Sequence, residues 1–213
     1  MKEVVVLLHG IWMRPVVMSA LGSFLRDQGY TVLQPGYASL RKTPVENAAS
    51  LCQQLPALLA APASANKFHF VCHSLGGLVA LHLLQHCQEL LSGRLVTLGT
   101  PVQGSMIAQR ISHWPVVDSM LGESLENGLA GMELPDSLPC EWGAIAGNKA
   151  LGVGSVLGGF QGQENDGTVT VSETRSELQN EHLTLPVNHT GLLFSRVVFE
   201  QVACFLQDGK FCR

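Results

Sequence analysis

The chain has 213 residues, which is enough for one well-buried core and short for two, so we expect a single domain over residues 1–213. Hydrophobic residues make up 46% of the chain and charged residues only 14%, against a usual charged share of about 25%, and this composition excludes a disordered protein. The net charge of −4, without clustered Lys and Arg, argues against nucleic-acid binding.

The first apolar run extends only from Val4 to Leu8, and His9-Gly10 follows it directly. This run is too short for a transmembrane helix, which needs about 20 apolar residues, and no other run approaches that length. It also lacks the longer apolar segment and the cleavage site of a signal peptide. We therefore interpret residues 4–8 as a buried strand and expect a cytoplasmic protein without a transmembrane segment.

The six cysteines form no C-x-x-C pair, so a zinc site and a thioredoxin-like site have no support. Their scattered and mostly apolar settings predict buried, reduced thiols. A disulfide between Cys204 and Cys212 stays open, although a cytoplasmic location counts against it. The cysteines are Cys52, Cys72, Cys87, Cys140, Cys204 and Cys212.

Short β-branched runs alternate with longer helical stretches along the chain. We expect strands at 4–8, 31–34, 67–72, 94–98, 141–146 and, more weakly, 182–185, and helices at 15–28, 43–60, 74–91 and 191–207. In the second helix Thr43 and Glu46 form a capping box around Pro44, and Pro56 predicts a bend. This alternation predicts parallel βαβ units in a three-layer α/β/α sandwich with a mostly parallel sheet of about six strands.

Two stretches break this rhythm, at 103–139 and at 147–167, and the second carries seven glycines. Long loops inside a compact domain are often functional. The first stretch is apolar enough to be a lid that opens at a lipid surface, but we prefer a small cap packed on a pocket. Such a cap could also form a homodimer interface. Its apolar residues are Met106, Ile107, Ile111, Trp114, Val116, Val117, Met120 and Leu121.

The strongest chemical signal is the segment from Cys72 to Gly77, Cys-His-Ser-Leu-Gly-Gly, between an expected strand and an expected helix. A nucleophile elbow needs this strand–turn–helix context, with small residues two before and two after the serine, to expose the serine hydroxyl at the end of the sheet. Gly76 meets the second demand, and Cys72 replaces the usual glycine of the first. A serine helix cap is the alternative, and we favour Ser74 as a nucleophile.

The loop after the first strand contains His9-Gly10-Ile11-Trp12. In folds with a nucleophile elbow, this loop supplies half of an oxyanion hole. Acyl transfer develops charge on the carbonyl oxygen, and fixed backbone N–H groups stabilise that charge. We expect Ile11 and Leu75 to donate these two N–H groups. His9 is interpreted as a structural residue of the loop.

A nucleophilic serine needs a base, and the base needs a carboxylate to orient it. His189 follows the last expected strand and precedes the final helix, so we expect it to be the base. Asp166, in Asn165-Asp166-Gly167, precedes it and is the expected acid, although this segment can also be a plain turn. The weaker alternatives are His82, His86, His113 and His182 for the base, and Glu164, Asp136 and Asp118 for the acid.

Together these segments resemble the lipase and esterase branch of the α/β-hydrolase superfamily, including its minimal bacterial lipases and its acetyltransferase- or hydrolase-type members. The motifs fall in the family's order and cover nearly the whole chain. The family's Gly-Thr-Pro-His-x-Gly-Ser segment reads Gly99-Thr100-Pro101-Val102-Gln103-Gly104-Ser105 here, so Val102 replaces a histidine, which bears on the shape of the pocket.

The resemblance implies an α/β-hydrolase fold that lacks the first two strands of larger relatives, and it implies no cofactor and no metal. It implies Ser74, Asp166 and His189 as a catalytic triad acting on a small-molecule or lipid ester, with Ile11 and Leu75 as oxyanion donors. Trp12, His73 and Val102 are the expected substrate contacts. An acyltransferase or thioesterase would use the same triad, and a non-catalytic binding protein on the same scaffold is the alternative from another class.

Overall fold

The computed structural model describes residues 2–60, 65–90, 92–112, 121–152, 160 and 162–212. The expected turn at 61–66 and the expected cap residues Trp114, Val116, Val117 and Met120 lie wholly or partly outside these residues. Among the described helices, none combines the length and the apolar character that crossing a membrane requires.

Six strands form one sheet in the order β2-β1-β3-β4-β5-β6, and every neighbouring pair is parallel. This confirms the parallel six-stranded sheet that the sequence predicted. The strands are β1 (Lys2–Leu8), β2 (Thr31–Leu33), β3 (Ala65–His73), β4 (Leu95–Leu98), β5 (Trp142–Gly147) and β6 (Glu181–Leu185).

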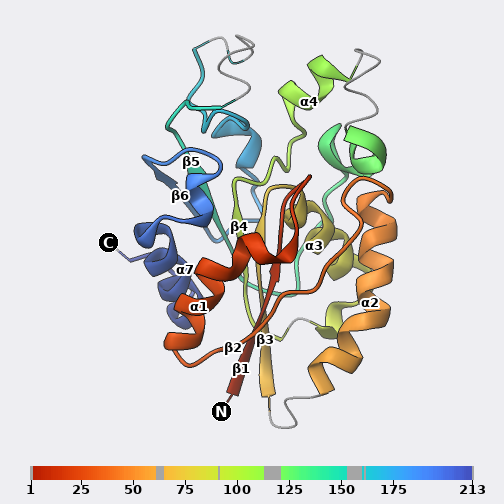
Figure 1. Cartoon of the computed structure of the whole chain (residues 1–213), viewed down its shortest axis with the longest axis vertical. Coiled ribbons are helices and arrows are strands. Elements are labelled where there is room, and N and C mark those ends of the chain that lie inside the picture. Colours follow the sequence, from red (N-terminus) through yellow and green to blue (C-terminus); the bar gives the residue numbers. More distant parts are fainter. Residues whose placement is uncertain are drawn as a thin grey trace.

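Helices cover both faces of the sheet, with α1 and α7 on one side and α2 and α3 on the other (Figure 1). The helices are α1 (Ser19–Asp27), α2 (Pro44–Ala60), α3 (Leu75–His86), α4 (Met106–Ile111) and α7 (Arg196–Asp208). Short helical turns are η1 (Pro15–Met18), η2 (Gln88–Leu90), η3 (Gly122–Ser124), η4 (Leu125–Leu129), η5 (Ser172–Thr174) and η6 (Gly191–Leu193).

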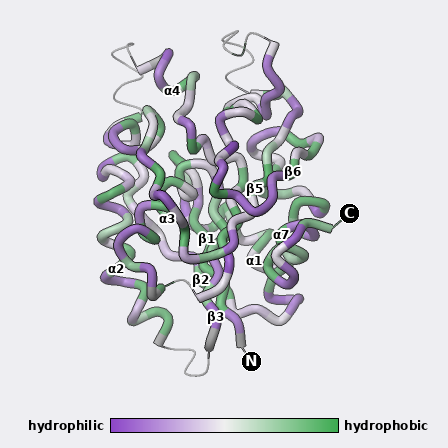
Figure 2. Tube along the Cα trace, turned by 180° about the vertical axis from the view of Figure 1, so that it is seen from behind, coloured by the Kyte–Doolittle hydropathy of each residue, from purple (hydrophilic) through white to green (hydrophobic). Residues whose placement is uncertain are grey.

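The core has two halves because side chains along a strand alternate between its faces. In β1, Val4, Val6 and Leu8 pack against residues of α2 and α3, whereas Val5 and Leu7 pack against residues of α1 and α7. All five side chains are fully buried. Figure 2 accordingly shows a hydrophobic centre of strands with hydrophilic stretches on the surrounding helices. A strand covered on both faces needs this continuous apolar run.

The capping box of α2 is present as expected. The Thr43 backbone N–H donates to Glu46 Oε2 at 2.9 Å, and the Glu46 backbone N–H donates to Thr43 Oγ1 at 3.2 Å. Pro56 lies inside the helix. The paired hydrogen bonds satisfy donors that the first turn of a helix leaves free, so they fix where α2 begins.

Three helices differ from their expected bounds. The helix expected at 15–28 starts with the short turn η1, so α1 begins at Ser19. The helix expected at 74–91 ends at His86, because Cys87 has φ −135° and ψ 58° and cannot continue it. The helix expected from Gly191 begins at Arg196, after η6 and an extended Ser195. Phe194 lies in the connection before α7, outside the apolar stripe of that helix, and is 57% exposed.

The expectation of reduced cysteines is wrong for four of the six. Disulfides join Cys52 to Cys87 and Cys204 to Cys212, with Cα–Cα distances of 6.2 Å and 5.8 Å. Both distances lie in the range that a disulfide requires. The first pair is 35 residues apart in sequence and meets only because α2 packs beside α3, which spacing cannot show. Cys72 and Cys140 are free thiols.

Candidate active site

Ser74 occupies a sharp turn between β3 and α3, with φ 52° and ψ −124°. A positive φ is costly for a serine and persists only where the surroundings hold it. Here the Ser74 N–H donates to the Leu98 carbonyl at 2.9 Å, and the Thr100 hydroxyl donates to the Ser74 carbonyl at 3.0 Å. Two bonds from the next strand and its loop therefore fix the turn, and the side chain stays 5% exposed.

Gly76 must be a glycine because the helix starts directly against the end of β1. A Cβ added there would lie 2.6 Å from the carbonyl oxygens of both Leu8 and His9. Cys72, two residues before the serine, is fully buried, and its burial raises the pKa of its thiol. The sequence requirement for a small residue after Ser74 therefore has a steric cause in the neighbouring strand.

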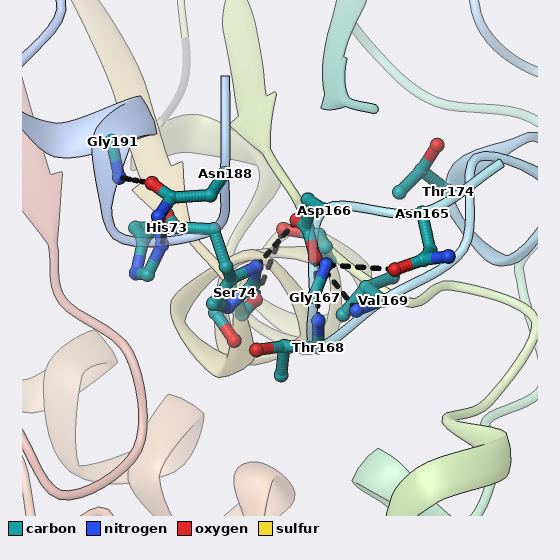
Figure 3. A network of polar contacts seen from close by, with 12 residues as sticks. His73, Ser74, Asn165, Asp166, Gly167, Thr168, Val169, Thr174, Asn188 and Gly191 are labelled. Atoms are coloured by element: carbon teal, nitrogen blue, oxygen red, sulfur yellow. Dashed lines mark hydrogen bonds and ion pairs between the residues drawn. The ribbon is translucent and has the colours of Figure 1, made fainter. Parts of the chain in front are cut away.

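Asp166 and His189 form a buried pair beside this turn. His189 Nδ1 lies 2.6 Å from Asp166 Oδ2, and the two residues are 8% and 1% exposed. The other carboxylate oxygen accepts the backbone N–H groups of Thr168 at 2.9 Å and Val169 at 2.7 Å. Figure 3 shows Asp166 and its loop, in which the Val169 N–H donates to the carboxylate. The carboxylate places the imidazole proton on Nδ1 and leaves Nε2 as the acceptor.

His73 connects the serine turn to the histidine loop. Its Nε2 lies 3.1 Å from the His189 carbonyl oxygen, and the two rings are 4.7 Å apart. Burial lowers the pKa of His73 well below its usual value, so the ring is neutral and donates from Nε2 to the carbonyl. Within the described part of the chain, no hydrogen bond joins the Ser74 hydroxyl to His189, and such contacts are often long before substrate binds.

The loop after β1 brings the Ile11 backbone close to Ser74, since both residues line one cavity. Within the described residues, neither the Ile11 nor the Leu75 N–H donates to another backbone atom. Tyr37 holds this loop, because its hydroxyl donates to the His9 carbonyl and its ring stacks on His9 at 4.4 Å. His9 is 1% exposed, which agrees with a structural role. The sequence contained no signal for Tyr37, because it follows β2 and meets His9 only in the fold.

A small apolar cavity of about 50 Å³ opens beside Ser74. It lies between the loop after β1, the loop after β4, the cap region and the Asp166 loop. Trp12 lines it at the exposed rim, with φ 60° and 54% exposure. The other lining residues are Ile11, Ser74, Pro101, Ser105, Ile107, Ala108, Leu121, Leu129, Thr168 and Val169.

The structure brings five of the expected site residues together, and of the expected substrate contacts only Trp12 is among the described residues that line the cavity. Ser74, Asp166 and His189 converge, and Ile11 and Leu75 flank the serine. Val102 is 2% exposed in the core, and neither it nor His73 lines the cavity. Of the alternatives, Glu164 and Asp136 are exposed, His82 binds the Asn127 carbonyl at 2.7 Å, and His182 lies 2.8 Å from the Thr174 hydroxyl. His113 and Asp118 lie outside the described residues.

Glu173 is a buried carboxylate that the sequence reading missed. It is 5% exposed and accepts the Thr170 N–H at 2.6 Å in a second capping box, and the Met106 N–H at 2.5 Å. Burial raises the pKa of this carboxyl above its usual value. The residue therefore joins the Asp166 loop to the start of α4, which lines the cavity. Glu173 follows Thr170 by three residues, the spacing of a capping box, so the sequence could have predicted this contact.

Comparisons with known proteins agree with this fold. The model of the Alpha/beta hydrolase family matches residues 5–162. A comparison with curated protein sequences found no match. The mature form of a Bacillus licheniformis lipase is similar in structure, with a TM-score of 0.80 at 20% identity over 99% of this chain and 93% of that one. The chain spans 52% of the propeptide form of the same lipase, with a TM-score of 0.84 at 21% identity.

Two further structures share the fold at low identity. A metagenomic carboxyl esterase has a TM-score of 0.63 at 17% identity, over 88% of this chain and 64% of that one. A thioesterase from the prodiginine pathway of Streptomyces coelicolor has a TM-score of 0.65 at 12% identity, over 96% and 85%. At these identities the likeness shows the fold alone. Since the family model covers most of the sequence and the fold agrees with it, this chain belongs to the alpha/beta hydrolase family.

Proposed function

We propose that this hydrolase cleaves carboxylic esters through an acyl-enzyme intermediate on Ser74. The observation that carries the proposal is the buried contact of 2.6 Å between His189 Nδ1 and Asp166 Oδ2, beside a serine held at φ 52°. A general base oriented by a carboxylate next to a strained serine is the arrangement that nucleophilic acyl transfer requires.

In the proposed reaction, His189 Nε2 takes the proton of the Ser74 hydroxyl as its oxygen attacks the ester carbonyl carbon. Asp166 stabilises the imidazolium that forms, and the Ile11 and Leu75 N–H groups bind the oxyanion. The imidazolium then gives its proton to the leaving alcohol, and the acyl group stays on Ser74. Water then attacks the acyl carbonyl carbon while His189 takes a proton from it. The imidazolium returns this proton to the Ser74 oxygen as the acid leaves.

An acyltransferase or a thioesterase would use the same groups with another acceptor or leaving group. The likeness to a solved thioesterase keeps this second proposal open, although it concerns the fold alone. A non-catalytic scaffold is less consistent with the site, because a role in packing alone does not explain a buried carboxylate aimed at a histidine beside a strained serine.

The cap region and the cellular location of the protein are proposals separate from the reaction. Ile107 and Leu121 of the cap region are buried in the core, which supports a packed cap over 103–139 and leaves a homodimer through it as a prediction.

Two disulfides are typical of oxidising compartments, and this argues against the cytoplasmic location that the sequence suggested.

Hydrolysis of p-nitrophenyl butyrate by the wild type and by Ser74→Ala tests the proposal. We expect the substitution to abolish turnover while circular dichroism and the melting temperature stay close to those of the wild type. Thr190→Ala, an exposed change next to the expected base, is the matched control and should keep activity. Equal activity of wild type and Ser74→Ala would overturn the assignment of the nucleophile.

A further inference from the structure

We infer that the cavity beside Ser74 is an acyl pocket that accepts short acyl chains, of about two to four carbons, and excludes longer ones. The inference rests on the proposed function and deepens it by naming the acyl group. Ile107, Leu121 and Leu129 close the pocket and set this limit.

The identity of the lining shows which half of an ester the cavity would hold. In serine acyl transfer the leaving alcohol takes its proton from the histidine, so the alcohol must lie next to His189. The described lining includes Ser74 and Ile11, the expected oxyanion donor, and does not include His189. The cavity therefore lies on the side of the reacting carbon where the acyl chain extends.

The size of the cavity limits what fits without rearrangement. An apolar cavity of about 150 Å³ in another protein binds benzene, which has six carbons. The cavity here has about 50 Å³, a third of that volume, so it holds about two or three carbons beyond the ester carbonyl. Its lining is almost wholly apolar, which suits an unsubstituted alkyl chain.

Part of the cavity lining belongs to the protein core. Ile107, Leu121 and Leu129 are 5%, 2% and 6% exposed, and all three belong to the cluster packed on α2 and α3. A longer chain that follows the cavity towards these side chains would have to displace them, and well-packed cores resist added volume. The limit therefore comes from core packing on the far side of the cavity.

Hydrogen bonds hold this wall in place at several points. The Ser105 N–H donates to the Leu129 carbonyl at 2.8 Å, and the Gln109 side chain donates to the Ala130 carbonyl at 3.0 Å. Glu173 accepts the Met106 N–H at 2.5 Å. The two segments that form the wall, around α4 and η4, are thus joined to each other and to the Asp166 loop.

Inactivation by p-nitrophenyl alkylphosphonates tests the pocket without requiring turnover. The serine attacks phosphorus and releases p-nitrophenol, and the alkyl group takes the place of the acyl chain. Each rate is divided by the spontaneous hydrolysis rate of the reagent. We expect the methyl and propyl reagents to inactivate the wild type at least tenfold faster than the heptyl reagent, with the adduct on Ser74.

Variants of the wall make the test specific. Leu129→Ala should raise the heptyl rate at least fivefold and leave the methyl rate within twofold, because it lengthens the cavity. Leu125→Ala removes the same atoms from the same turn but lies outside the described lining, so it should leave the ratio of rates unchanged. Ile107→Ala replaces Leu129→Ala if melting curves show that the latter does not fold.

The outcomes separate the inference from the proposed function. A heptyl rate equal to or above the methyl rate, with the adduct on Ser74, overturns the inference and leaves the ester hydrolase standing. A ratio that Leu129→Ala and Leu125→Ala change equally overturns the assignment of the wall. No inactivation by any reagent contradicts the proposed function and the inference together.

Discussion

His73 donates a hydrogen bond from Nε2 to the backbone carbonyl of His189, at 3.1 Å and wholly inside the protein. The residue before the expected nucleophile thus holds the residue expected to be its base, although 116 positions separate them. Because Ser74 and His73 are neighbours in the chain, this bond fixes the distance between the serine turn and the imidazole loop.

Removing this bond should impair turnover more than binding. We predict that His73→Ala lowers kcat about 10- to 100-fold with little change in KM, since a displacement of about 1 Å in a reacting group can cost a factor of about 100. His69→Ala is a matched control, because His69 lies on the same strand and is equally buried. It should lose stability and keep kcat. Equal kcat losses in both variants would contradict a positioning role for His73.

Glu173→Gln should destabilise the protein. The carboxylate accepts N–H groups from Thr170 and Met106 with its two oxygens, and an amide can accept only one of them. A buried donor left without a partner costs about 1–3 kcal/mol, which for a protein of this size lowers Tm by about 2–4 °C per kcal/mol. Differential scanning calorimetry measures this loss. The exposed Glu177→Gln should melt like the wild type, and a Glu173→Gln variant that also does so would contradict the account.

Thiol titration should distinguish the two states of the cysteines. In denaturant without reductant we expect two reactive thiols, from Cys72 and Cys140, and six after reduction. Protein purified from an oxidising and from a reducing host compartment should be compared. Six free thiols in both preparations would remove the argument against a cytoplasmic location.

Stability should fall as pH is lowered below neutrality. Burial lowers the pKa of His69 to about 4, while the unfolded chain keeps a value near 6.5. The unfolded state therefore binds more protons between these values, and the stability present above pH 6.5 is lost as pH falls towards 4. His182 shifts in the same direction, also to about 4, and the raised pKa of Glu173 acts in the opposite direction.

Urea unfolding at several pH values measures this dependence. The free energy of unfolding should decrease from pH 7 to pH 5 in the wild type, with a smaller slope in His69→Gln, which lacks one of the titrating groups. A wild-type stability that rises over this interval, or a slope that His69→Gln leaves unchanged, would be inconsistent with a neutral buried His69.

Local patterns were enough to predict the sheet and the order of the chemical residues. Val4 to Leu8 reads as a buried strand because it is covered on both faces, and Ser74 stands out because the residues two positions before and after it are small. The expected Asp166 and His189 followed from chain order and loop position, and the structure places them in contact. In each case the signal lies within a few residues of the feature it predicts.

The features that sequence reasoning missed depend on contacts between distant segments. Tyr37 orients the His9 loop from after β2, and Cys52 meets Cys87 across two helices. Leu129 lines the cavity, yet nothing in its local sequence distinguishes it from any other buried leucine. The end of α3 and the start of α7 were misplaced because apolar periodicity continues through residues whose backbone leaves the helix.

The most direct test of the central claim is labelling with a fluorophosphonate, followed by peptide mass spectrometry. We expect one adduct per chain, on Ser74, with labelling lost in Ser74→Ala and strongly slowed in His189→Gln. Absence of labelling in the folded wild type, or an adduct on another serine that persists in Ser74→Ala, would contradict an activated nucleophile at this turn.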